Sequence, residues 1–175
     1  MAIGTGAQAP RENYPAWVRN ELERDYYDTE WGVPVTDERG MLERVCLEGF
    51  QSGLSWYTVL VKRPAFRELF ANFVPDALVK FTNDDVERLL QDERIIRNRL
   101  KVQAAIFNAR QILQLQQQYG SFHQWLEQHH PRSRSEWVAL FKRHFKFMGN
   151  EIVGEFLMST GYLPGAHIES CPVYQ

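Results

Sequence analysis

The chain has 175 residues, a formal net charge of −2 and a hydrophobic content of 44%, which is ordinary for a globular protein. A chain of this length fits one domain and buries roughly 70% of its unfolded surface, so it can hold a core without disulfides. Two cysteines, no signal-peptide pattern and no apolar run of about 18 residues argue against a secreted disulfide scaffold and a membrane protein. We therefore expect a cytoplasmic protein with no membrane partner.

Helical periodicity dominates the chain, and strand signals are weak. Residues 1–13 are predicted to form a mobile N-terminal tail, and residues 14–175 a single all-α domain of roughly seven to nine helices. Apolar stripes at helical spacing occupy 41–46, 86–90, 95–113, 137–141 and 152–157.

Local signals place the ends of several of these helices. Thr82 and Ser133 each begin a capping-box pattern, and Gly161 is placed to end the last helix. The long stripe at 95–113 predicts one helix that bends near Asn98.

Charge is distributed unevenly along the chain. Residues 94–150 carry ten Lys and Arg against two Asp and Glu, whereas residues 1–93 carry ten against 17. A basic segment inside an acidic protein is a candidate surface for a polyanion such as DNA. A solvated helix face has the same composition, so charge alone leaves both interpretations open.

The segment Phe145-Lys146-Phe147-Met148-Gly149 joins the last two predicted helices. A tight turn before a helix N-terminus can direct free N–H groups at a phosphate. The same letters also fit an ordinary turn with both phenylalanines packed inward, and spacing does not decide between the two.

The sequence contains no motif of a nucleophilic or metal-dependent hydrolase: it has no G-x-S-x-G, no P-loop and no H-E-x-x-H. His167 and Cys171 lie four residues apart and could share a zinc ion, but a structural zinc site needs four ligands. Glu48 is unusual in another way, because it interrupts an apolar helical run in C-L-E-G-F-Q-S-G-L-S-W.

Five blocks together resemble the 3-methyladenine DNA glycosylase I family. In chain order they are Y-Y-D-T-E-W-G-V-P, C-L-E-G-F-Q-S-G-L-S-W-Y-T-V-L, I-I-R-N-R-L-K-V-Q-A-A-I-F-N-A-R, F-K-F-M-G and H-I-E-S-C. The resemblance implies a helix-hairpin-helix DNA glycosylase fold, with the hairpin element near 136–161. It also implies a monofunctional base-excision repair enzyme that hydrolyses the N-glycosidic bond of 3-methyladenine in alkylated double-stranded DNA and releases the free base.

The resemblance assigns roles to individual residues. Base binding falls to Tyr26, Trp31, Glu48 and Trp56, and DNA binding to Gln51, Gly53, Leu54, Lys146 and Gly149. The chemistry agrees, because 3-methyladenine in DNA is cationic, and aromatic faces and a carboxylate attract a cation. Glu48 is assigned first to recognising the base and second to catalysis, by assisting water or the sugar cation.

Family members of the best-known type hold their chain ends together with zinc, and here that pattern is incomplete. His167 and Cys171 match the C-terminal pair, but Tyr27 stands where the family has a histidine and no cysteine precedes Cys46. Two ligands do not close a tetrahedral site. We therefore expect no zinc and no other cofactor, with aromatic packing of Trp17 or Tyr27 in its place.

Two other functions remain open at this point. One is a non-catalytic DNA-binding protein on the same scaffold, and the other is a glycosylase for a different alkylated purine. In each case we expect a monomer.

Overall fold

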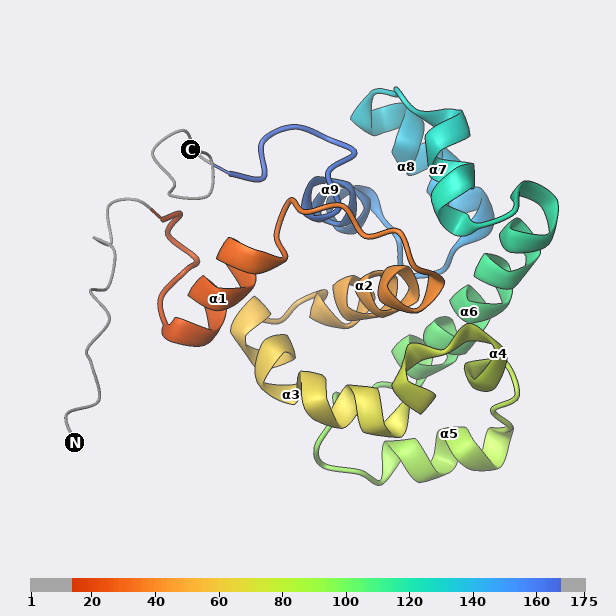
Figure 1. Cartoon of the computed structure of the whole chain (residues 1–175). Coiled ribbons are helices and arrows are strands. Elements are labelled where there is room, and N and C mark those ends of the chain that lie inside the picture. Colours follow the sequence, from red (N-terminus) through yellow and green to blue (C-terminus); the bar gives the residue numbers. More distant parts are fainter. Residues whose placement is uncertain (1–13, 168–175) are drawn as a thin grey trace, which may run out of the picture.

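The computed structural model of the protein describes residues 14–167, in which helices are joined by short loops and no strand is present (Figure 1). The elements are α1 (Glu21–Thr29), α2 (Glu38–Gln51), α3 (Trp56–Leu69), η2 (Ala71–Phe73), α4 (Pro75–Leu78), α5 (Asn83–Leu90), α6 (Arg99–Tyr119), α7 (Phe122–His129), α8 (Arg134–His144) and α9 (Asn150–Ser159). The all-α prediction is confirmed. The predicted tail at 1–13 lies outside the described residues.

The predicted helix ends are largely confirmed. Thr82 and Ser133 form complete capping boxes at the starts of α5 and α8. Gly161 follows α9 with a positive φ of 87°, which is a conformation that glycine adopts without strain.

One boundary prediction was wrong. Asn98 does not bend a long helix but caps the start of α6, where its side-chain oxygen accepts a hydrogen bond from the Lys101 N–H at 3.1 Å. Ile95 and Ile96 precede the helix. An asparagine side chain can satisfy a free backbone N–H at a helix start, and that interaction favours a cap over a continuous helix.

Helix α2 runs through the middle of the molecule, with α3, α4, α6, α7 and α9 packed around it (Figure 1). Every residue from Met41 to Phe50 is buried. A helix buried on all sides normally carries only apolar residues. This one also carries Glu43, Arg44 and Glu48, so each of these charges must be balanced inside the protein or by a ligand.

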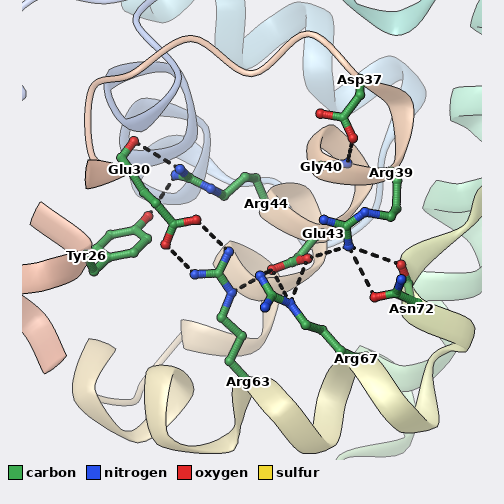
Figure 2. A network of polar contacts seen from close by, with 10 residues as sticks. All are labelled: Tyr26, Glu30, Asp37, Arg39, Gly40, Glu43, Arg44, Arg63, Arg67 and Asn72. Atoms are coloured by element: carbon green, nitrogen blue, oxygen red, sulfur yellow. Dashed lines mark hydrogen bonds and ion pairs between the residues drawn. The ribbon is translucent and has the colours of Figure 1, made fainter.

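Glu43 is balanced by arginines. Its carboxylate accepts hydrogen bonds from Arg39 at 2.9 Å, from Arg63 and from Arg67 at 2.8 Å (Figure 2). Burial acts to raise the pKa of Glu43, but the hydrogen bonds and charges of Arg67 and Arg63 outweigh it and hold that pKa below its ordinary value. Arg63 also forms a two-pronged pair with Glu30, just after α1, so the network joins α1, α2 and α3.

Glu43→Gln is expected to destabilise the fold by about 3 kcal/mol, because it leaves buried arginine charge without its carboxylate. The melting temperature should fall by roughly 6–12 °C for a chain of this size. The loss should shrink in acid, because a carboxylate with a lowered folded-state pKa stabilises the fold only until the pH falls through that pKa.

Thermal unfolding at several pH values measures this effect. Glu87→Gln is the matched control, since Glu87 pairs with Arg99 on the surface and its loss should leave the melting temperature nearly unchanged. Equal melting temperatures for Glu43→Gln and the wild type at neutral pH would show that the network does not hold these helices together.

Candidate active site

A cavity of about 470 Å³ opens between α1, the start of α3, the end of α2 and α9. Its size is within the range of sites for small molecules. It is lined by aromatic, acidic and amide side chains: Trp17, Arg19, Asn20, Glu23, Trp31, Glu48, Gln51, Ser55, Trp56, Tyr57 and Glu155. Three of the four predicted base-binding residues, Trp31, Glu48 and Trp56, are therefore brought together here.

Glu48 is the buried carboxylate of this cavity. Its side chain is on the inward face of α2, the residue is 2% exposed, and its Oε1 atom has no hydrogen-bond partner within residues 14–167. Burial raises the pKa of Glu48 to about 8; the negative charge of Glu155 adds to the rise and the positive charge of Arg44 opposes it. A buried carboxylate without a partner is costly for the empty protein. Its orientation therefore indicates a ligand that supplies hydrogen-bond donors or positive charge.

Aromatic rings surround this carboxylate. Tyr26 and Trp56 pack with ring centroids 5.1 Å apart and an interplanar angle of 56°, and Tyr26 lies 6.3 Å from Trp31. Two contacts fix the orientation of Trp31. Its indole N–H donates to the Ala166 carbonyl at 2.7 Å, and its ring centroid lies 5.6 Å from that of Trp17. The indole faces are thus fixed before any ligand arrives.

The indole nitrogen of Trp56 is a second unused polar group at the site. It is buried and has no acceptor among the described residues. Trp56 begins α3, whose N-cap Ser55 accepts a hydrogen bond from the Thr58 N–H. Two residues that line the cavity thus have a polar atom that is unpaired within residues 14–167, an acceptor on Glu48 and a donor on Trp56, and the edge of a heterocyclic base carries groups of both kinds.

Tyr26 stands behind the cavity and does not line it. Its hydroxyl accepts a hydrogen bond from Arg44 Nη1 at 2.8 Å, while Arg44 Nη2 donates to the Glu30 carbonyl at 3.0 Å (Figure 2). Burial raises the pKa of Tyr26, so the hydroxyl stays neutral. Tyr26 therefore supports Trp31 and Trp56 and connects them to the arginine network.

The turn between α2 and α3 carries the three neighbouring residues that the sequence assigned to DNA. Gln51 lines the cavity, Gly53 has a positive φ of 78°, and Leu54 is 38% exposed. Gln51 and Leu54 exchange two hydrogen bonds, and Lys101 donates to the Phe50 and Ser52 carbonyls at the end of α2. These hydrogen bonds fix the turn, and its exposed apolar residue Leu54 follows the cavity residue Gln51.

The segment 145–149 forms the predicted turn between α8 and α9. Asn108 of α6 clamps it, accepting from the Lys146 N–H at 2.8 Å and donating to the Lys146 carbonyl at 2.9 Å. Phe145 and Met148 are buried, but Phe147 is 38% exposed. The alternative with both phenylalanines packed inward is therefore wrong. A side chain pointing outward before a helix start suits a surface that receives a ligand.

Gly149 precedes α9 without any side-chain cap, and a Cβ added there would meet no heavy atom within 4 Å. The first N–H groups of α9 are consequently not covered by a capping side chain, which favours an anion at this position. Two cations lie nearby: Lys146, whose ammonium lies 4.3 Å from the centre of the Phe107 ring, and Arg134, which donates to the Asn150 carbonyl at 3.4 Å.

Tyr27, the residue that departs from the expected zinc pattern, packs against His167, the residue that matches it. Their rings meet edge to face at 4.5 Å, and His167 Nε2 lies 3.0 Å from the Tyr27 carbonyl oxygen. This is the aromatic packing expected from the sequence. Between residues 14 and 167 no three His, Cys, Asp or Glu side chains come together as metal ligands, and Cys171 lies outside that range. The described residues alone do not bring together the ligands of a four-ligand zinc site.

The model of the methyladenine glycosylase family matches residues 17–137, and this match covers more than half of the chain. The chain belongs to the methyladenine glycosylase family. It is 40% identical to DNA-3-methyladenine glycosylase 1 of Escherichia coli, over 90% of this chain and 95% of the relative. It is 35% identical to the DNA-3-methyladenine glycosylase of Haemophilus influenzae, over 89% and 95%.

Solved structures give the same assignment. The fold superimposes on 3-methyladenine DNA glycosylase I from Staphylococcus aureus with a TM-score of 0.81 at 29% identity, covering 89% of this chain and 92% of that one. That structure describes how the S. aureus enzyme recognises 3-methyladenine. A second 3-methyladenine DNA glycosylase I structure matches with a TM-score of 0.79 at 40% identity, over 90% and 97%.

This member of the methyladenine glycosylase family has cavity residues that sequence reasoning missed, namely Trp17, Arg19, Asn20, Glu23, Ser55, Tyr57 and Glu155. The sequence could have indicated Glu155 as a site residue, because it interrupts the apolar run I-V-G-E-F-L much as Glu48 interrupts the apolar run of its own helix. Trp17, Arg19 and Asn20 precede α1 in a segment without helical periodicity, so no pattern placed them near α2 or α9.

Glu48→Gln is expected to stabilise the ligand-free protein in alkali. The folded protein keeps the Glu48 proton from the ordinary pKa of 4.5 up to about 8, whereas the unfolded chain has lost it. Stability therefore falls as the pH rises through that window and stays low above it. The free energy of unfolding of the glutamine variant should exceed that of the wild type by on the order of 5 kcal/mol near pH 9, with almost no difference near pH 4.

Urea unfolding at these two pH values measures the difference. If Glu48→Gln were less stable than the wild type in alkali, the Glu48 carboxylate would have a favourable partner inside the protein, and the assignment of a ligand-ready group would be wrong.

Proposed function

We propose that the protein is a monofunctional DNA glycosylase of base-excision repair that releases 3-methyladenine from alkylated DNA. The observation that carries this is the buried Glu48 carboxylate, without a partner in the described part of the chain, among the aromatic rings of a cavity large enough for a nucleobase. The relatives named DNA-3-methyladenine glycosylase in two bacteria support the same activity.

Selectivity is derived from charge. 3-Methyladenine in DNA is a cation, whereas normal adenine is neutral. An ionised Glu48 accepts hydrogen bonds from the amino edge of the cation and opposes its charge, and Trp31 and Trp56 offer the π faces that attract it. A neutral base gives no compensation for ionising Glu48 in a buried site, so the same residue disfavours undamaged adenine.

The reaction needs little acid catalysis, because the base leaves with a charge already on it. The bond between N9 and the sugar C1′ breaks, its electron pair neutralises the base, and water adds to C1′ and loses a proton. The ionised Glu48 carboxylate stabilises positive charge near the sugar or assists that water. Its first role in this proposal is recognition of the extruded base, which any glycosylase must take out of the stack.

The hairpin and the α2–α3 turn supply the DNA contacts of this proposal. Gly149 and the following N–H groups hold a backbone phosphate with Lys146 close by, and such contacts give affinity and register but no lesion selectivity. Gln51, Gly53 and Leu54 approach the space that the extruded base leaves, and the exposed apolar Leu54 suits the neighbouring stacked bases.

We propose further that the protein acts as a monomer in the cytoplasm, without zinc or another cofactor. No helix in the described range is long and apolar enough to cross a membrane. The tyrosine at position 27 and the contact of His167 with the Tyr27 carbonyl support the absence of zinc. A glycosylase for another cationic purine is the second candidate, since the cavity recognises charge through groups that do not depend on the methyl position.

Incubation of the protein with methylated double-stranded DNA, followed by chromatography of the released bases, tests the function directly. We expect free 3-methyladenine, and Glu48→Gln should reduce its release by at least about tenfold through loss of a charge-assisted hydrogen bond. Glu68→Gln, which removes an exposed charge on α3, is the control.

The same assay separates the alternatives. Release of a different purine would support the second glycosylase reading. Retained DNA binding with no released base would identify a non-catalytic binding protein.

Gly149→Ala is expected to weaken DNA binding by about tenfold without lowering the melting temperature much. The free protein has room for the methyl group, whereas a phosphate held at the start of α9 would not leave that room. Lys146→Gln should act differently, reducing the slope of log affinity against log salt concentration by about 0.9.

Fluorescence anisotropy with labelled duplex DNA at several salt concentrations measures both effects. Gly149→Ala should keep the wild-type salt slope, because it changes no charge. Wild-type affinity in the alanine variant would place the phosphate elsewhere.

A further inference from the structure

Glu155 is a second carboxylate of the base cavity. It lies on α9, a helix that packs against α2, and lines the same cavity as Glu48. The side chain is half-buried, and within residues 14–167 its carboxylate has no hydrogen bond or ion pair. Burial raises the pKa of Glu155, Arg134 opposes that rise and Glu151 adds to it.

The third acidic residue of the cavity, Glu23, has hydrogen-bond partners on its Oε2 atom. Glu23 accepts hydrogen bonds from the Arg19 N–H at 2.8 Å and from the Asn20 side-chain amide at 2.9 Å, and so stabilises the start of α1. Glu48 and Glu155 are the two acidic lining residues whose carboxylates have no hydrogen bond within residues 14–167.

The two open carboxylates act on each other through their charges. The negative charge of Glu155 is the largest electrostatic contribution that raises the pKa of Glu48. Like charges in a poorly solvated cavity resist simultaneous ionisation, and a bound cation removes that conflict. A single carboxylate attracts a cation. Two carboxylates that repel each other attract a cation and, in addition, destabilise the ionised cavity when no cation is bound.

We propose that Glu155 is a specificity-determining residue that forms, with Glu48, a two-carboxylate receptor for cationic purines. This inference rests on the proposed function and extends it. The preference for a charged base then depends on two carboxylates, one on α2 and one on α9. The substrate class that follows is a purine with a fixed positive charge, recognised by that charge as well as by its shape.

The other charged and titratable groups around Glu48 define how the receptor responds to pH. Arg44, one turn earlier on α2, favours the ionised form of Glu48, while Tyr26 on α1 stays neutral. Arg19, Glu23 and Tyr57 complete the titratable lining of the cavity. Removing Glu155 leaves Arg44 as the main charge acting on Glu48, so Glu48 should then ionise at a lower pH.

Binding of two small probes tests the proposal without DNA and without catalysis. The probes are the 3,9-dimethyladenine cation, which resembles the methylated base with its glycosidic bond intact, and neutral 9-methyladenine. Isothermal titration calorimetry from about pH 6 to pH 10 gives the ratio of their affinities for the wild type and for Glu155→Gln.

We expect the affinity ratio of cation to neutral base near pH 9.5 to fall at least about fivefold in Glu155→Gln. The midpoint at which cation affinity rises with pH should also move down by at least about half a unit. The second effect separates charge coupling from a packing role, because a merely loosened cavity would weaken both probes and leave the midpoint in place.

Glu151→Gln is the matched control, since it removes the same charge one turn earlier on α9 from a residue that does not line the cavity. It should keep the affinity ratio within about twofold of the wild type, because an exposed charge is screened by solvent. Equal melting temperatures would show that both variants are folded.

Two failures would be distinguishable. A wild type that prefers the cation, together with a Glu155→Gln variant that keeps the same ratio and midpoint, would overturn the role of Glu155 and leave the glycosylase function intact. A wild type with no preference for the cation would overturn the charge recognition on which both proposals depend.

Discussion

Burial of charge on the central helix is the constraint that organises this protein. Helix α2 is enclosed from Met41 to Phe50, so its charged residues are almost fully shielded from bulk water. An isolated charge in such a position costs several kcal/mol. Glu43 is satisfied by three arginines and Arg44 by the Tyr26 hydroxyl and the Glu30 carbonyl, whereas Glu48 keeps one oxygen unpaired within residues 14–167. The helix thereby stabilises the fold at its beginning and prepares a binding site at its end.

The arginine network and the cavity belong to one framework. Arg63 of α3 joins Glu30, just after α1, to Glu43 of α2 (Figure 2). The first residue of α3 is Trp56. Ordering these three helices also orders the rings of Tyr26, Trp31 and Trp56 around Glu48. Such preorganisation matters for recognising an extruded base, because a site that must rearrange on binding loses part of its selectivity.

Several helix ends and turns of the fold could be predicted from short stretches of sequence. The capping boxes at Thr82 and Ser133, the stop at Gly161 and the turn at 145–149 lie where the sequence predicts them, since each depends on residues a few positions apart. The sequence predicted a bend at Asn98 because the apolar residues on both sides of it continue the helical period. A bent helix and a new helix capped by Asn98 share this pattern, and the structure shows the cap. Glu48 stood out for a comparable reason, as a charge inside an apolar stripe.

The sequence by itself determined the helical class, the family and the identity of the buried acid, because periodicity and motif letters are properties of short segments. Only the tertiary structure decided which residues share the cavity. Tyr26 was predicted to line the cavity, but it packs against the lining residues Trp31 and Trp56 instead. Glu155 lines the same cavity as Glu48, although it lies more than 100 positions later in the sequence. The physical reason is that α2 and α9 pack against each other, and helical periodicity does not specify which turns of two packed helices meet.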